Sequence, residues 1–131
     1  EITAFHDQVG YLLWEPATKK IYMTLSIPRA QTLLAEGTAE PHANEWTVQA
    51  VEGDERTGIV SGPFLQKYFR TVAFTLKMTF HDDGTFSYDE TTVMKVDGQD
   101  HDFLHTDRNT LKLVEAPAAL NPAAIEAGKR P

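Results

Sequence analysis

Thr71-Val72-Ala73-Phe74-Thr75-Leu76-Lys77-Met78-Thr79-Phe80 is the stretch of sequence that decides the fold class. Large apolar side chains alternate in it with small or polar ones. This spacing predicts a β-strand with one buried face, because on a helix the same apolar side chains would wrap around the axis. The side chains predicted to share that face are Val72, Phe74, Leu76, Met78 and Phe80.

Turn residues bound further strand-like stretches on both sides. Asp83-Gly84 and Asp97-Gly98 are typical of hairpin turns, and Pro63 favours a short helical turn. The other predicted strands cover residues 5–14, 20–27, 46–51, 58–61, 85–96 and 103–114, with a short or irregular one at 31–39. Short strands joined by hairpin-sized connections predict an all-β fold, an antiparallel sandwich or barrel, and favour an up-and-down β-barrel.

Length and composition narrow the class of protein. The 131 residues suffice for one domain, which we place at 1–115, followed by an Ala/Pro-rich tail at 116–131 with a short helix. A net charge of −7 argues against binding to nucleic acid or anionic membranes. The absence of cysteine excludes disulfides and thiolate chemistry and fits a reducing, cytoplasmic compartment. No apolar run reaches the ~18 residues of a membrane span.

The last predicted strand begins with an unusually polar run, His105-Thr106-Asp107-Arg108-Asn109-Thr110-Leu111. Such a run suits a strand that lines a cavity better than one that lines a dry core. His105 shares its face with Asp107, Asn109, Leu111 and Leu113. Two interpretations stay open: His105 is the single imidazole that a heme needs, or it holds a loop through hydrogen bonds. A zinc-type site with His101 is not expected, since four residues of strand span about 13 Å.

Several other side chains are predicted to line the pocket. Arg70 or Arg108, with Tyr88, could hold the carboxylate of a ligand, as a planar guanidinium does well. Tyr11, in the first predicted strand, is assigned to the same pocket. The alternative for each arginine is a surface charge, such as a tie between Arg108 and Asp107.

An ordered set of motifs resembles the nitrobindin-like, or heme-binding-like, β-barrel family, whose bacterial members are often labelled fatty-acid-binding-protein-like. Ile27-Pro28-Arg29, Asp82-Asp83-Gly84-Thr85-Phe86 and the run from His105 to Leu111 belong to this set. Further matching segments lie at 5–16, 33–40, 58–65 and 69–71. The resemblance covers nearly the whole predicted domain, and the motifs are specific as a set rather than singly.

The resemblance implies a nominally ten-stranded barrel whose cavity binds a small hydrophobic ligand. In nitrobindins a histidine near the start of the last strand binds ferric heme b from one side, and His105 matches it. The implied chemistry is nitric oxide binding and, if the protein is an enzyme, isomerisation of peroxynitrite to nitrate. No other metal is expected. The alternative functions are a fatty-acid-like lipid carrier and a non-catalytic barrel that acts through assembly.

The chain departs from the family pattern at its start. The family opens with a Gly-x-Trp-x-Gly type motif and further segments, which do not precede Phe5 here. We therefore expect the first strands of the barrel to be absent from this sequence. A barrel without them would expose two sheet edges, so a homodimer, a strand exchange or a second fragment is expected to cover them.

Overall fold

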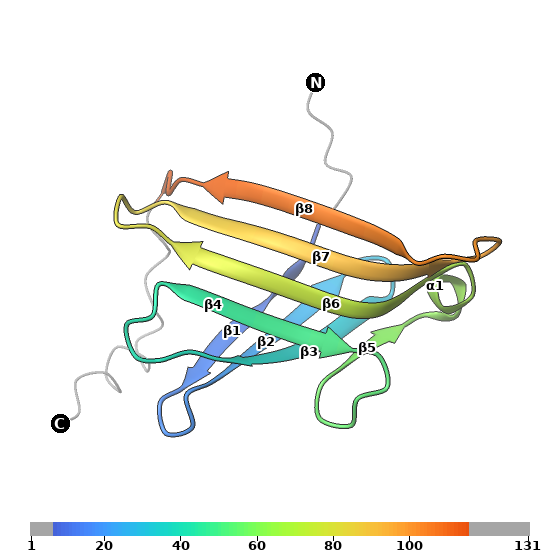
Figure 1. Ribbon diagram of the computed structural model, residues 1–131, viewed down its shortest axis with the longest axis horizontal. Helices are drawn as coiled ribbons and strands as arrows, with labels where there is room; N and C mark the ends of the chain where they lie inside the picture. Colours follow the sequence, from blue (N-terminus) through green and yellow to red (C-terminus); the bar gives the residue numbers. More distant parts are fainter. Residues whose placement is uncertain (1–6, 116–131) are drawn as a thin grey trace.

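The computed structural model describes residues 7–115, which form one antiparallel sheet of eight strands (Figure 1). A short helix, α1 (Pro63–Tyr68), follows Gly62 with proline in its first turn, as predicted. No helix in this part of the chain is long and apolar enough to cross a membrane. The predicted tail helix lies outside the described residues. The strands are β1 (Val9–Glu15), β2 (Lys20–Ile27), β3 (Gln31–Thr38), β4 (Glu45–Val51), β5 (Gly58–Ser61), β6 (Phe69–Phe80), β7 (Phe86–Val96) and β8 (Phe103–Leu111).

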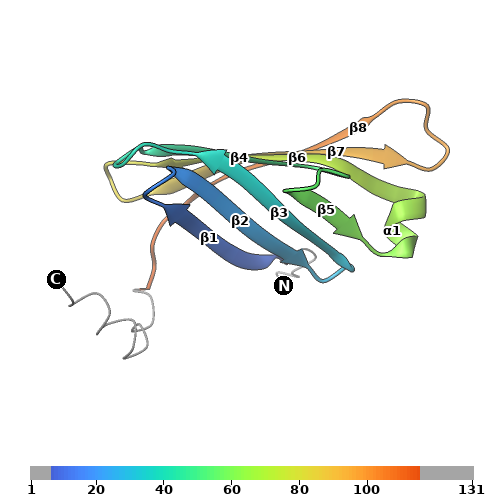
Figure 2. The same ribbon diagram turned by 90° about the horizontal axis from the view of Figure 1, so that it is seen from below.

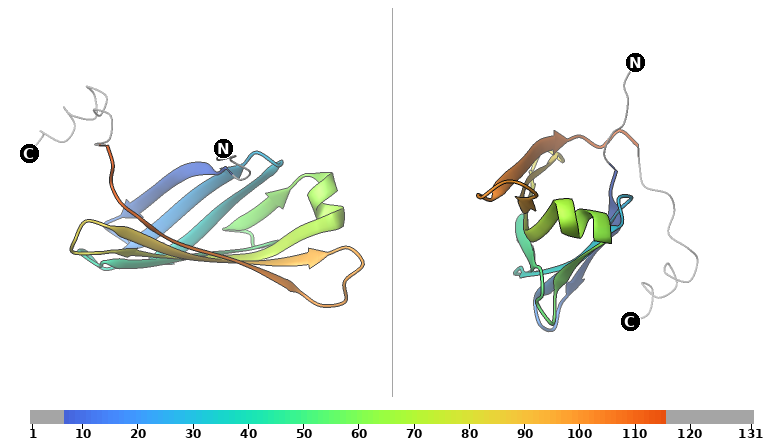
Figure 3. Two further views of the ribbon diagram at one scale, coloured as in Figure 1. Left: turned by 90° about the horizontal axis from the view of Figure 1, so that it is seen from above. Right: turned by 90° about the vertical axis from the view of Figure 1, so that its right-hand side faces the viewer.

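The strands follow an up-and-down path with one excursion. The order in the sheet is β1-β2-β3-β4-β6-β7-β8, and β5 leaves this path to pair with β3. Gly84 and Gly98 have φ values of 80° and 79°, which confirms the two predicted hairpin turns. The sheet curls into a trough, and α1 lies across one end of it (Figures 2 and 3).

The all-β antiparallel, barrel-like prediction is confirmed, but the sheet does not close. Among residues 7–115 no ladder joins β1 to β8, so the trough is open along that side. The two edge strands therefore each have one neighbour within the described part of the chain: β2 for β1 and β7 for β8.

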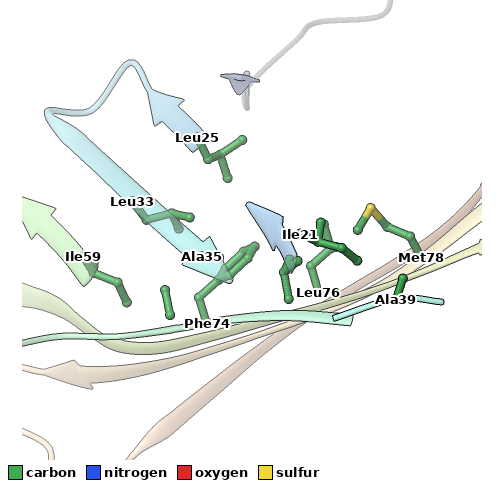
Figure 4. Close-up of a cluster of buried hydrophobic side chains, with 11 residues drawn as sticks. Ile21, Leu25, Leu33, Ala35, Ala39, Ile59, Phe74, Leu76 and Met78 are labelled. Carbon is green, nitrogen blue, oxygen red and sulfur yellow. The ribbon is translucent and has the colours of Figure 1, made fainter. Parts of the chain in front are cut away.

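The hydrophobic core fills the part of the trough between β2, β3, β4, β5 and β6 (Figure 4). Ile21 and Val48 are the largest side chains that are fully buried in it. Alternation along each strand explains the burial, since every second side chain points to the concave side. The described residues of β7 and β8 contribute none of these fully buried apolar side chains, but Phe86 and Tyr88 of β7 are half-buried and pack against the core.

The predicted inward face of β6 is wrong at Val72, because the strand contains a β-bulge. The register with β7 shifts between Thr71 and Ala73, and an extra residue reverses the alternation. Phe74, Leu76 and Met78 are buried as predicted, but Thr71 takes the inward position that we had assigned to Val72 and is only 4% exposed. Its hydroxyl accepts a hydrogen bond of 2.9 Å from Gln31 Nε2, which satisfies the buried oxygen.

Gly37 marks a close approach between two strands of the core. It pairs with Ile21 of β2 on one side and with Val48 of β4 on the other. A Cβ atom added at Gly37 would lie 1.9 Å from the carbonyl oxygen of Thr47. Only glycine therefore fits here without moving β4.

Candidate functional site

The concave face of the β7–β8 hairpin carries six polar side chains. Residues that are directly opposite in an antiparallel ladder point to the same face. Glu90 and Tyr88 are opposite the buried Leu76 and Met78 of β6, so their row faces the trough. We call this surface the hairpin wall; it consists of the facing pairs Thr92–His105, Glu90–Asp107 and Tyr88–Asn109.

Hydrogen bonds fix the half of the hairpin wall that is remote from α1. The Tyr88 hydroxyl donates to Asp107 Oδ2 at 2.7 Å and accepts from Asn109 Nδ2 at 2.9 Å. Asn109 Nδ2 also lies 3.2 Å from Asp107 Oδ1. Burial, and then the hydrogen bond to Asp107, raise the pKa of the Tyr88 phenol. Asp107 therefore holds Tyr88 and Asn109, and no hydrogen bond joins it to His105.

The raised pKa of Tyr88 leads to a pH-dependent prediction. The folded state holds the phenolic proton more tightly than the unfolded state, so this part of the stability is present below pH ~10 and is lost as the pH rises through the raised pKa. Tyr88→Phe should lower the free energy of unfolding by about 1 kcal/mol at neutral pH. In a pH titration followed by phenolate absorbance, the parent should show a Tyr88 transition above pH ~10 that is absent from Tyr88→Phe. If the transition lost in Tyr88→Phe lies at or below pH ~10, the assignment is wrong.

His105 projects into a hollow of about 610 Å³ beside the hairpin wall. No described residue forms a hydrogen bond with its imidazole, which leaves the loop-holding interpretation without support among residues 7–115. Both ring nitrogens are open to a ligand. The other residues that line this hollow are Asp7, Gln8, Arg29, Tyr88, Glu90, Thr106, Asp107 and Asn109.

A second hollow, of about 500 Å³, lies under α1 and is largely apolar. Phe64, Leu65, Phe69 and Met94 form its apolar side, whereas Arg29, Gln31 and Thr71 form the other. Arg29 lines both hollows, so they meet at its side chain. Each volume lies in the range of small-molecule sites, about 300–1,000 Å³.

Three of the predicted pocket residues lie on the outer face of the sheet and are therefore not part of the site. Tyr11 is 78% exposed and belongs to the opposite row from the inward-facing side chains of β1. Arg108 pairs with Asp89 across the ladder at 2.7 Å, not with Asp107. Arg70 pairs with Glu52 at 2.7 Å, because it precedes the bulge and alternates with the buried Thr71.

Arg29 lines the site but was not predicted from the sequence as a site residue. The residue follows Pro28 in the tight turn between β2 and β3, where its N–H donates to the carbonyl of Ile27 at 2.6 Å. The Gly62 N–H donates to the carbonyl of Ala30 at 2.7 Å, which ties this turn to the start of α1. The motif Ile27-Pro28-Arg29 was visible, but nothing in it indicates that the turn folds over the trough.

The site suits a ligand held by one imidazole better than a polydentate metal site. Within residues 7–115 no three His, Asp or Glu side chains converge to hold a metal ion. His105 lies where the hairpin wall changes character: Asp107 follows it on the same face, and Phe103, which is opposite Met94, precedes it. An imidazole is thus placed between a polar and an apolar surface.

Comparison with known proteins identifies the family. A family model described as the THAP4-like, heme-binding beta-barrel domain matches residues 1–112. No curated protein and no solved structure gives a significant match. The matched segment contains every strand of the sheet, which agrees with the open, barrel-like architecture. The chain therefore belongs to the THAP4-like family of heme-binding β-barrel domains, in agreement with the nitrobindin-like resemblance of its sequence.

Proposed function

We propose that this domain binds ferric heme in the trough, with His105 as the axial ligand. The observation that carries the proposal is the His105 imidazole, which faces the larger hollow with no hydrogen-bond partner among the described residues. The family match supports the same class of ligand, since the matching domain is heme-binding. The pocket then consists of Tyr88 and His105, which were predicted, together with Arg29.

The residues of the trough fit the chemistry of a heme. The ring is large and apolar, and Phe69 and Met94 offer an apolar surface close to the row of His105. A neutral imidazole is the ligand that ferric heme commonly takes from proteins. The polar half of the hairpin wall would offer a hydrated surface to the polar groups of the ligand. Donor, apolar surface and polar edge are thus present on one concave face.

The reaction that the resemblance implies needs little acid–base chemistry from the protein. His105 would hold the heme, and the bound heme iron would supply the chemistry that binds a small molecule such as nitric oxide. The tasks of this chain would be to hold the imidazole of His105 in place and to offer an apolar surface to the ring. We further propose that the domain, with heme bound in this way, isomerises peroxynitrite to nitrate.

Titration of the purified protein with hemin tests the proposal. We expect a saturable Soret band, shifted from that of free hemin, with one hemin per chain. The blank is the same buffer with the same amount of hemin and no protein. A spectrum that equals that blank at every hemin concentration would contradict heme binding.

A fatty-acid-like carrier is the second candidate function, and the hollow under α1 favours it. Phe64, Leu65 and Phe69 present an apolar surface that could take an acyl chain. Native mass spectrometry of the protein as isolated separates the two functions. A bound lipid that hemin does not displace would support the carrier.

A further inference from the structure

We infer that Arg29 is the anchor for a carboxylate of the bound ligand. The inference rests on the proposed function, because it assigns the carboxylate-binding residue of the same trough. The ligand class is an amphipathic carboxylate, with an apolar body in the hollow under α1 and a carboxylate at Arg29. A heme propionate and a fatty acid share this chemistry.

The fold holds Arg29 at the junction of the two hollows. The turn that carries it is closed by the hydrogen bond to Ile27 and tied to α1 through Ala30 and Gly62. Arg29 lines the hollow that contains Phe64 and Met94 and also the hollow beside the hairpin wall. This arrangement suits a ligand with an apolar body and a charged end, because each part of the ligand meets a surface of matching character.

The acidic side chains around the trough would repel an anionic ligand, so binding such a ligand requires a cationic side chain. Asp7, Glu90 and Asp107 line the larger hollow, so three carboxylates face any acid that enters. Arg29 is the one Lys or Arg side chain that the structure, over residues 7–115, places in the lining of either hollow. A guanidinium binds a carboxylate through two parallel hydrogen bonds, which a hydrated ammonium does not reproduce.

The neighbouring amide is not a competing anchor. Gln31 Nε2 already donates to Ser61 Oγ and to Thr71 Oγ1, both at 2.9 Å. These two bonds use both N–H groups of the amide. Recognition of a carboxylate at this end of the trough therefore depends on Arg29.

A cycle of one substitution and one ligand change tests the inference. Hemin and hemin dimethyl ester, whose propionates are capped, are titrated into the parent and Arg29→Gln. We expect Arg29→Gln to weaken hemin binding about tenfold, the effect of one lost charge-assisted hydrogen bond, and to leave ester binding unchanged. Arg56→Gln is the matched control, because Arg56 is 77% exposed in the loop before β5 and lines neither hollow.

Each outcome separates the anchor from the proposed function. Normal hemin binding by Arg29→Gln, or equal losses with hemin and its ester, would overturn the anchor and leave heme binding intact. If the parent binds neither form of hemin, heme binding fails, and the same cycle is run with a fluorescent fatty acid and its methyl ester. A loss of about tenfold for the acid alone would then support the anchor, and any other pattern would overturn it.

Discussion

Replacing His105 with alanine should abolish the Soret shift that hemin produces with the parent protein. The imidazole supplies the proposed bond to iron, and no second histidine lines either hollow in the described part of the chain. Loss of this bond leaves only the apolar surface and Arg29 to retain the ring. The measurement is a hemin titration followed by absorbance, with the dissociation constant fitted for each protein.

His101→Ala is the matched control for this substitution. His101 lies in the β7–β8 turn, 3.2 Å from Asp100, and lines neither hollow. Its removal should leave the hemin titration unchanged. Because His105 has no hydrogen bond among the described residues, His105→Ala should also keep the free energy of unfolding, measured by urea denaturation, within about 0.5 kcal/mol of the parent. Equal hemin affinity for the parent and His105→Ala would refute the axial role.

Gly37→Ala should lower the free energy of unfolding by about 3 kcal/mol or more, which could unfold a domain of this size. The added methyl group would meet the carbonyl oxygen of Thr47 at 1.9 Å. The neighbour is backbone, so no side-chain rotation relieves the contact and β4 must move away from β3. Urea denaturation followed by tryptophan fluorescence measures the loss.

Gly58→Ala provides the comparison for the glycine prediction. The nearest atom to its added Cβ is the carbonyl oxygen of Asp54 at 3.4 Å, which is close to ordinary contact. We expect a change within about 0.5 kcal/mol. Similar stabilities for the two variants would show that β3 and β4 separate easily at Gly37.

Local sequence patterns predicted most of the strands. Residues 20–27 and 58–61 were predicted as strands and form β2 and β5 with those bounds. The bulge in β6 could not be foreseen, because by hydrophobicity Val72 fits an inward position better than Thr71 does. The pairing with β7 decides between them, and that pairing is a tertiary fact. The open side of the trough, between β1 and β8, is likewise a property of strand pairing.

The candidate site was predictable only where alternation was regular. The shared face of His105, Asp107 and Asn109 followed from the two-residue repeat, and the ladder with β7 agrees with it. The same repeat places Arg108 on the outer face, so its assignment to the pocket conflicted with that of His105. Arg29 could not be predicted in this way, because a turn has no two-residue repeat. The position of this turn depends on the hydrogen bond between Ala30 and Gly62.

The edge position of β8 has a consequence for how long a ligand stays bound. Within residues 7–115 this strand is held by one ladder, and nearly all of its side chains are exposed. Edge strands of this kind open locally at a lower free-energy cost than the core strands beside them. Since His105 lies on β8, fraying of the strand would carry the iron ligand away from the trough. Residence time would then follow local opening, and bound heme should slow amide hydrogen exchange in β8 more than in β4.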